Sequence, residues 1–172
     1  MVYGIAKMLN FAHGDVIMVG AFVIYTAMSS LGLSPILSVI LAMVLCTILG
    51  MTIEKIAYRP LRNAGSPLAV LITAIGVSYL LQNLGLLIFG ADTKAFKSIV
   101  NMEALQFAEG QLAVSGEAIV TIITSIVIML ALTSFVKYTK AGRAMVAVSE
   151  DRGAAQLMGI NVNGTIALTF AI

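Results

Sequence analysis

The sequence is short of charge. Of its 172 residues only 10% are charged, whereas 60% are hydrophobic and the mean hydropathy is +1.04. A soluble domain carries about 25% charged residues, so this chain lacks the charge that would cover a water-facing surface. Uncharged runs such as the 38 residues from Val16 to Ile53 indicate a polytopic membrane protein instead.

Cysteine, histidine and phosphate-binding motifs are also scarce. Cys46 is the single cysteine and lies in an apolar run, so an internal disulfide is excluded and an inert thiol is expected. His13 is the single histidine, and without partner ligands it predicts no metal site. The sequence contains no G-x-x-x-x-G-K-S/T loop to cradle nucleotide phosphates. If transport is driven by ATP, the ATPase must therefore be another chain.

Turn residues and charges divide the apolar sequence into spans. An 18-residue helix reaches about 27 Å at a rise of about 1.5 Å per residue, which covers a bilayer core. Backbone polar groups must be paired in lipid and continuously apolar runs do not suit a barrel, so the spans are expected to be helices. The sequence predicts an all-α fold of four complete transmembrane helices plus the start of a fifth, over about 16–33, 36–53, 68–89, 118–136 and 165–172.

Lysine and arginine counts predict the orientation of these spans. Residues 54–67 hold three basic residues and 137–164 hold four, whereas 90–117 holds two against four acidic residues, and 32–35 holds none. By the positive-inside rule, loops 54–67 and 137–164 are expected to be cytoplasmic. The residues before Val16 are then expected near the cytoplasmic side.

The segment 137–164 is amphipathic. A helix over 144–158 would place Met145, Val148, Ala155 and Met158 near one face, with Gly159 at the C′ position that ends the helix. Residues 161–164 are expected to form a turn toward the membrane. Two interpretations stay open, an interfacial helix on lipid headgroups and a docking surface for a cytoplasmic partner. The charged and hydroxyl residues of its polar face are Arg143, Ser149, Glu150, Asp151 and Arg152.

Two polar amides, Gln82 and Asn83, interrupt the predicted span 68–89. They are expected either to form hydrogen bonds between helices or to line a substrate path.

The stretch NFAHGD precedes the first uncharged run. Asn10 and His13 lie three residues apart and therefore on one helical face, which predicts a polar clamp that fixes a break between helices, or else a gate near the inner mouth. Gly14 is expected to let the backbone bend. Asp15 is expected to cap a helix that starts at Val16, where the helix dipole also favours a negative charge.

Several stretches taken together resemble a known family. In chain order they are NFAHGDVIMVGAF, IEKIAYRPLRN, LITAIGVSYLLQN, YTKAGRAMVAVSEDRGAAQLMGIN and IALTFAI. As a set they resemble the LivH-type permease of bacterial branched-chain amino-acid ABC importers, from Tyr3 to Ile172. Members of that family are longer at both ends, so residues 1–172 are expected to be part of a single permease domain.

The resemblance implies a transport subunit of the bacterial plasma (inner) membrane rather than an enzyme. Its implied partners are a second, LivM-like permease subunit, two ATP-binding subunits and an extracytoplasmic substrate-binding protein that delivers leucine, isoleucine or valine. This chain would bind no cofactor, and ATP would be used by the partner subunits. A related permease for urea, amides or other small polar solutes remains an alternative. An ion-coupled secondary transporter is a second alternative, although the predicted spans 16–53, 68–89 and 118–136 contain no Asp, Glu, Lys, Arg or His to support it.

By the same resemblance, 137–164 is the cytoplasmic coupling loop that seats in a groove of the ATPase. Relatives often carry Glu-Ala-Ala, three residues and then Gly in this loop, and here Gly153 occupies the glutamate position. An acidic contact would therefore come from Glu150 or Asp151. The residues expected to couple to the ATPase are Gly142, Arg143, Glu150, Asp151, Ala154, Ala155 and Gly159.

Overall fold

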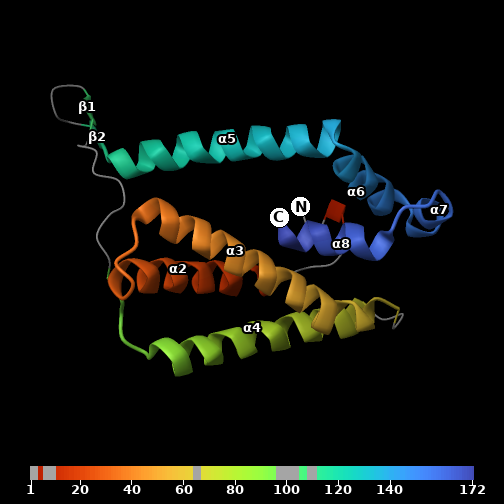
Figure 1. The fold of residues 1–172 in the computed structure, drawn as a ribbon, viewed down its shortest axis with the longest axis horizontal. Coiled ribbons are helices and arrows are strands. Elements are labelled where there is room, and N and C mark those ends of the chain that lie inside the picture. The colour runs from red at the N-terminus through yellow and green to blue at the C-terminus, as the bar shows by residue number, and fades with distance from the viewer. Residues whose placement is uncertain (1–3, 6–10, 64–66, 96–104, 108–111) are drawn as a thin grey trace. The chain divides into compact units, whose positions relative to one another are not determined.

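A computed structural model describes residues 4–5, 11–63, 67–95, 105–107 and 112–172. The chain divides into two compact units (Figure 1). Unit 1 comprises residues 1–95 with 144–172, and unit 2 comprises residues 96–143. Helices dominate both units, which confirms the predicted all-α membrane class.

Unit 1 is built from apolar helices and short helical turns. Figure 1 shows α2, α3 and α4 side by side in this unit, with α8 beside α3. The elements are α2 (His13–Ser29), α3 (Pro35–Ile53), the π-helical turn η1 (Glu54–Tyr58), the 3₁₀ turn η2 (Pro60–Asn63), α4 (Pro67–Phe89), α7 (Arg152–Leu157) and α8 (Val162–Ala171). Unit 1 also includes the greater part of α6 (Lys140–Glu150), from Ala144 onward.

Local sequence explains how α2 and α3 form a tight pair. Gly32 adopts a positive φ of 63°, a backbone conformation that glycine reaches without steric cost. The Leu33 N–H then donates to the Ala27 carbonyl at 3.0 Å and closes the turn. Pro35 begins α3 at a position where its missing N–H has no intrahelical partner to lose.

The observed helices are shifted from several predicted spans. The predicted span 16–33 is displaced, because α2 begins at His13 and ends at Ser29. The span predicted over 36–53 continues through η1 to Tyr58. The turn predicted over 161–164 is wrong, since the Asn161 side chain accepts from the Gly164 N–H at 3.0 Å and starts α8 at Val162.

Three helices of the described chain are long and apolar enough to cross a membrane: Pro35–Tyr58, Leu68–Phe89 and Gly116–Tyr138. Helices α2 and α8 are apolar but shorter. The number of spans therefore stays a prediction. The extended helices also contain ionisable residues that the predicted spans left outside, namely His13 and Asp15 in α2 and Glu54 and Lys55 in Pro35–Tyr58.

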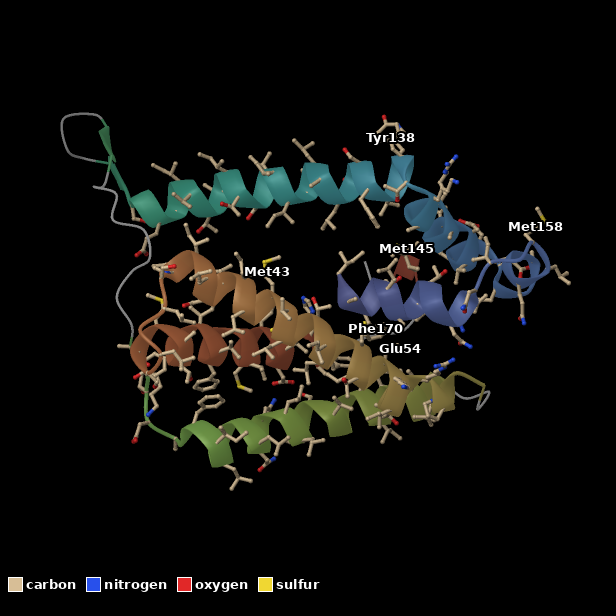
Figure 2. The ribbon with its side chains drawn as sticks, viewed as in Figure 1. Met43, Glu54, Tyr138, Met145, Met158 and Phe170 are labelled. Atoms are coloured by element: carbon tan, nitrogen blue, oxygen red, sulfur yellow. The ribbon has the colours of Figure 1, made fainter. Side chains whose placement is uncertain are left out.

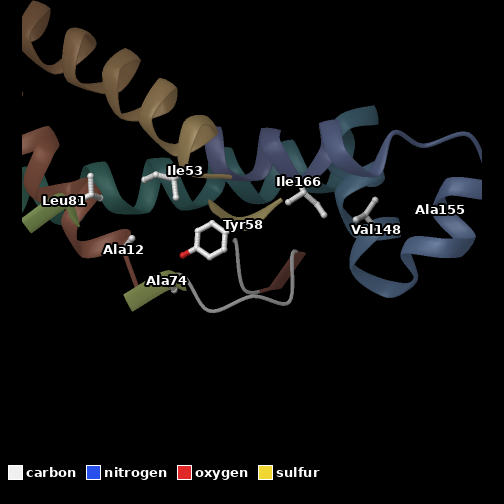
Figure 3. Close-up of a cluster of buried hydrophobic side chains, with 8 residues drawn as sticks. All are labelled: Ala12, Ile53, Tyr58, Ala74, Leu81, Val148, Ala155 and Ile166. Carbon is white, nitrogen blue, oxygen red and sulfur yellow. The ribbon is translucent and has the colours of Figure 1, made fainter. Parts of the chain in front are cut away.

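The core of unit 1 mixes small residues with one large aromatic side chain. In Figure 3 the buried Tyr58 ring lies beside Ala12 and Ala74. In lipid the hydrophobic effect does not drive helices together, so their association depends on close packing, which small side chains allow. The remaining members of this cluster are Ile53, Leu81, Val148, Ala155 and Ile166.

A close helix contact in unit 1 joins α3 to α8. A Cβ built on Gly50 would lie 2.4 Å from the Phe170 carbonyl oxygen, so no side chain fits there. Thr47 Oγ1 donates to the Ala171 carbonyl at 3.1 Å, and the Tyr58 and Phe170 rings lie 5.3 Å apart between centroids. Glycine at this point is what allows the two backbones to meet.

Unit 2 contains α5 (Gly116–Tyr138), the first residues of α6 and two short strands. The strands β1 (Leu105–Phe107) and β2 (Leu112–Val114) pair antiparallel, with Leu105 opposite Val114. They lie in the connector 90–117, for which the sequence predicted no strand. Ser115 then caps α5, because its side chain accepts from the Ala118 N–H at 3.3 Å.

Candidate functional site

A buried carboxylate joins α2 to α4. Asp15 lies in the first turn of α2 and is only 8% exposed. Its Oδ2 accepts a short hydrogen bond from Ser78 Oγ, and its Oδ1 accepts from Gln82 Nε2 at 3.0 Å. Gln82 Nε2 also donates to Ser78 Oγ at 3.2 Å. We call these three side chains the Asp15 cluster.

This geometry corrects the predicted capping role of Asp15. The N-cap of α2 is Ala12, and no side chain caps the helix. The Asp15 carboxylate is directed to donors on α4 instead of to its own helix. A negative charge in the first turn still suits the helix dipole.

The bend predicted at Gly14 is also wrong, because Gly14 lies within the regular part of α2. His13 is exposed at the start of this helix. Asn10 lies outside the described residues, so the clamp or gate expected for the Asn10–His13 pair remains a prediction.

Three successive contacts show that α2 and α4 run in the same direction. Asp15 meets Ser78 and Gln82. One turn later, the side chain of Met18 lies 3.2 Å from the position of a Cβ on Gly85. A further turn along, Phe22 and Phe89 stack with their centroids 4.3 Å apart and their planes at 4°.

The register of these contacts also places the carboxylate along α4. Ser78 is the central residue of α4, which runs from Pro67 to Phe89. Asp15 therefore lies level with the middle of a helix that is long and apolar enough to cross a membrane. An ionisable group near the middle of a membrane-spanning helix is costly and usually serves function.

The two amides of α4 have different roles. Gln82 forms the hydrogen bond between helices that was one of its two predicted roles. Asn83 instead donates from Nδ2 to the Tyr79 carbonyl of its own helix at 2.7 Å. Tyr79, Gln82 and Asn83 are all exposed on α4, so no described part of the chain covers them.

The amphipathic segment forms two helices rather than one. The predicted helix over 144–158 is interrupted at Asp151, which adopts an extended conformation with φ −148° and ψ 114°. The Asp151 side chain accepts from the Ala154 N–H at 3.0 Å and starts α7. An aspartate that can cap a new helix competes with continuation of the old one.

The break changes which residues of this segment are buried. Met145, Val148 and Ala155, three of the four residues predicted to share one face, are buried, whereas Met158 is 82% exposed and Leu157 is 91% exposed. Figure 2 shows Met158 at the end of α7, pointing away from the ribbon. Gly159 follows with a φ of 81°, in agreement with the predicted helix end. We call Leu157 and Met158 the α7 tip.

Two of the residues predicted to couple to an ATPase are buried. Ala155 is buried in the core cluster, and Gly142 is buried where α5 meets α6. A Cβ on Gly142 would lie 2.4 Å from the Phe135 carbonyl oxygen, so this glycine has a structural function. The predicted residues that are exposed are Arg143, Glu150, Asp151, Ala154 and Gly159.

The α7 tip was not predicted, because an uninterrupted helix would have placed Met158 on the same face as Met145 and Val148. The available signal was Asp151 itself, a good capping residue followed by small residues.

Among the described residues, no group of three histidine, cysteine or acidic side chains could hold a metal ion.

Long apolar helices, with a buried carboxylate level with the middle of one of them, are typical of a polytopic membrane protein. Comparison with known proteins identifies the family. The chain belongs to the family described as "Branched-chain amino acid transport system / permease component", whose model matches residues 1–172.

Individual relatives agree with this family. The chain is 39% identical, over an alignment of 183 residues, to the high-affinity branched-chain amino acid transport system permease protein LivH of Escherichia coli K12. It is 38% identical over 182 residues to the corresponding protein BraD of Pseudomonas aeruginosa. Both alignments cover 100% of this chain and 59% of the relative. No solved structure matches the chain.

Proposed function

We propose that this chain forms part of the solute path in an ATP-driven importer of leucine, isoleucine and valine. The observation that carries the proposal is the family match over residues 1–172, together with relatives whose names specify branched-chain amino acid transport. Because the chain spans 59% of their length, the activity is proposed for the whole protein that contains it.

The importer would contain several other chains. The proposed partners are a second permease subunit, two ATP-binding subunits and an extracytoplasmic substrate-binding protein. This chain would hold no cofactor and catalyse no reaction, and it would lie in the bacterial inner membrane with loops 54–67 and 137–164 in the cytoplasm. The absence of a phosphate-binding loop from the sequence supports this division of labour.

The transport step would be a change between two conformations of the helices. A ligand or partner shifts such an equilibrium only by the difference in its affinity for the two states. ATP-dependent closure of the ATPases would move the connector 137–164 and, through it, the helices that line the path. Candidates for the path or gate are Asn10, His13, Gln82 and Asn83.

The α7 tip is the proposed contact with the ATPase. Two adjacent apolar side chains that project from a loop expected in the cytoplasm suit a hydrophobic pocket on a protein partner. The exposed acids Glu150 and Asp151 flank the start of α7 and supply polar contacts at the rim.

Reconstitution tests the proposed activity. The complete complex is placed in proteoliposomes with ATP in the lumen, and uptake of radiolabelled leucine is measured in the presence of excess isoleucine, valine or urea. We expect uptake that requires ATP and that isoleucine and valine inhibit but urea does not. Inhibition by urea instead would favour a permease for small polar solutes.

One observation favours a second candidate function, an ion-coupled transporter. Asp15 and Glu54 are buried in helices of a membrane protein, and ion-coupled transporters place ionisable groups within the membrane. The same proteoliposomes separate the two functions. Uptake that persists without ATP and stops with a proton ionophore would support the second candidate and contradict the first.

A further inference from the structure

We infer that the Asp15 cluster binds a primary ammonium group, and that this group is the α-ammonium of the transported amino acid. The inference rests on the proposed function for the identity of the solute. It assigns a ligand chemistry to Asp15, which the sequence had marked only as a helix cap.

The first argument is the surplus of acceptors in the cluster. The Ser78 hydroxyl donates to Asp15, and the Gln82 amide donates both to Asp15 and to Ser78. Every side-chain donor of the three residues is thereby used. A carboxylate offers about four lone-pair directions and an amide oxygen two, so Asp15 and Gln82 Oε1 keep acceptor capacity that nothing in the described chain satisfies.

The second argument is charge. Asp15 is more than nine-tenths buried, level with the middle of α4, and it accepts hydrogen bonds from two neutral side chains. No lysine, arginine or histidine in the described residues pairs with it. Burial of an ionised carboxylate is costly unless the charge is paired and hydrogen-bonded, so a positively charged ligand would stabilise this arrangement.

The third argument is access and ligand shape. Asp15 is buried, whereas Gln82, which donates to it, is exposed on α4, so the proposed ligand would approach from the Gln82 side. A primary ammonium carries three N–H donors, which match a carboxylate oxygen and the free Gln82 Oε1. Charge-assisted bonds of this kind are among the strong hydrogen bonds in proteins.

The test measures equilibrium binding of radiolabelled leucine to the purified full-length permease–ATPase complex without its binding protein. Competitors are 3-methylbutylamine, which keeps the ammonium group and lacks the carboxylate, and 4-methylpentanoate, which keeps the carboxylate and lacks the ammonium group. We expect the amine to displace leucine at concentrations at which the acid does not. Displacement by the acid but not by the amine would overturn the inference.

Two variants and a matched control test the same inference. Asp15→Asn removes the charge at nearly constant size and is expected to weaken leucine binding at least about tenfold. Gln82→Leu removes the free acceptor and is expected to weaken binding less. The matched control is Thr26→Val, because Thr26 Oγ1 bonds only to the Phe22 carbonyl of its own helix. Unchanged leucine affinity in Asp15→Asn would overturn the inference.

The outcomes separate this inference from the proposed function. If the wild-type complex imports leucine with ATP but Asp15→Asn binds it as tightly as wild type, the ammonium site is wrong and the importer stands. If the wild-type complex imports no branched-chain amino acid, the proposed function itself fails. If Asp15→Asn does not assemble, the amine and acid competition in the wild-type complex decides.

Discussion

Replacing Gly50 by alanine should separate α3 from α8. The new methyl carbon would lie 2.4 Å from the Phe170 carbonyl oxygen, whereas ordinary van der Waals contacts begin at 3.4 Å. Both partners are backbone, so the two helices must move apart by about the difference, 1 Å. Overpacking of this kind costs about 1–3 kcal/mol, and the movement also stretches the Thr47–Ala171 hydrogen bond of 3.1 Å.

The matched control is Gly76→Ala in α4. A Cβ at Gly76 meets no atom within 4 Å, yet both substitutions gain the same higher helix propensity, up to about 1 kcal/mol. The difference between the two variants therefore isolates the α3–α8 contact.

The assay heats each purified variant in detergent and follows the folded fraction by size-exclusion chromatography. We expect Gly50→Ala to lose half its folded protein about 2–12 °C below Gly76→Ala, since 1 kcal/mol shifts Tm by about 2–4 °C in chains of this size. Equal midpoints would refute the reasoning, because the close approach of Gly50 to Phe170 would then not contribute to the stability of the folded protein.

Two further predictions concern the connector 137–164. Asp151→Ala removes the side-chain cap of α7 and should destabilise that helix by about 1 kcal/mol. Hydrogen exchange of amides 152–157 should therefore accelerate severalfold, whereas Asp151→Asn should preserve most of the protection. Equal exchange in both variants would contradict the capping role. Leu157→Asp combined with Met158→Asp should reduce co-purification of the ATP-binding subunits, because charge replaces the exposed apolar α7 tip. The exposed neighbour Gln156→Asp is the control, and equal recovery of the ATPase with the double variant and with this control would count against docking at the tip.

Helix class and the long apolar helices could be predicted because hydrophobicity acts locally and cumulatively. A run of apolar residues between charges predicts a helix whatever surrounds it. The boundary of α2 could not be predicted in this way. The Asp15 carboxylate accepts hydrogen bonds from Ser78 and Gln82, which lie 63 and 67 residues further along, and no local pattern reveals partners at that distance.

The single helix predicted over 144–158 was wrong for a different reason. Amphipathic periodicity grouped Met145 and Val148 on one face, and both are buried, since periodicity indicates which residues share a face. It did not report that capping by Asp151 would end the helix and redirect Met158 outward. Close approaches such as those of Gly50 and Gly142 were likewise invisible, because a glycine in a sequence does not reveal the backbone that it meets.

The π-helical turn Glu54–Tyr58 has a consequence for how this chain tolerates insertions and deletions. The Arg59 N–H donates to the Glu54 carbonyl five residues back, at 2.7 Å, so the turn holds one residue more than an α-helical turn would. Each residue of an α-helix rotates the chain by about 100°. A residue gained or lost here would reorient only the later part of the chain, including the ring of Tyr58, and would leave the apolar helix from Pro35 to Ile53 in phase.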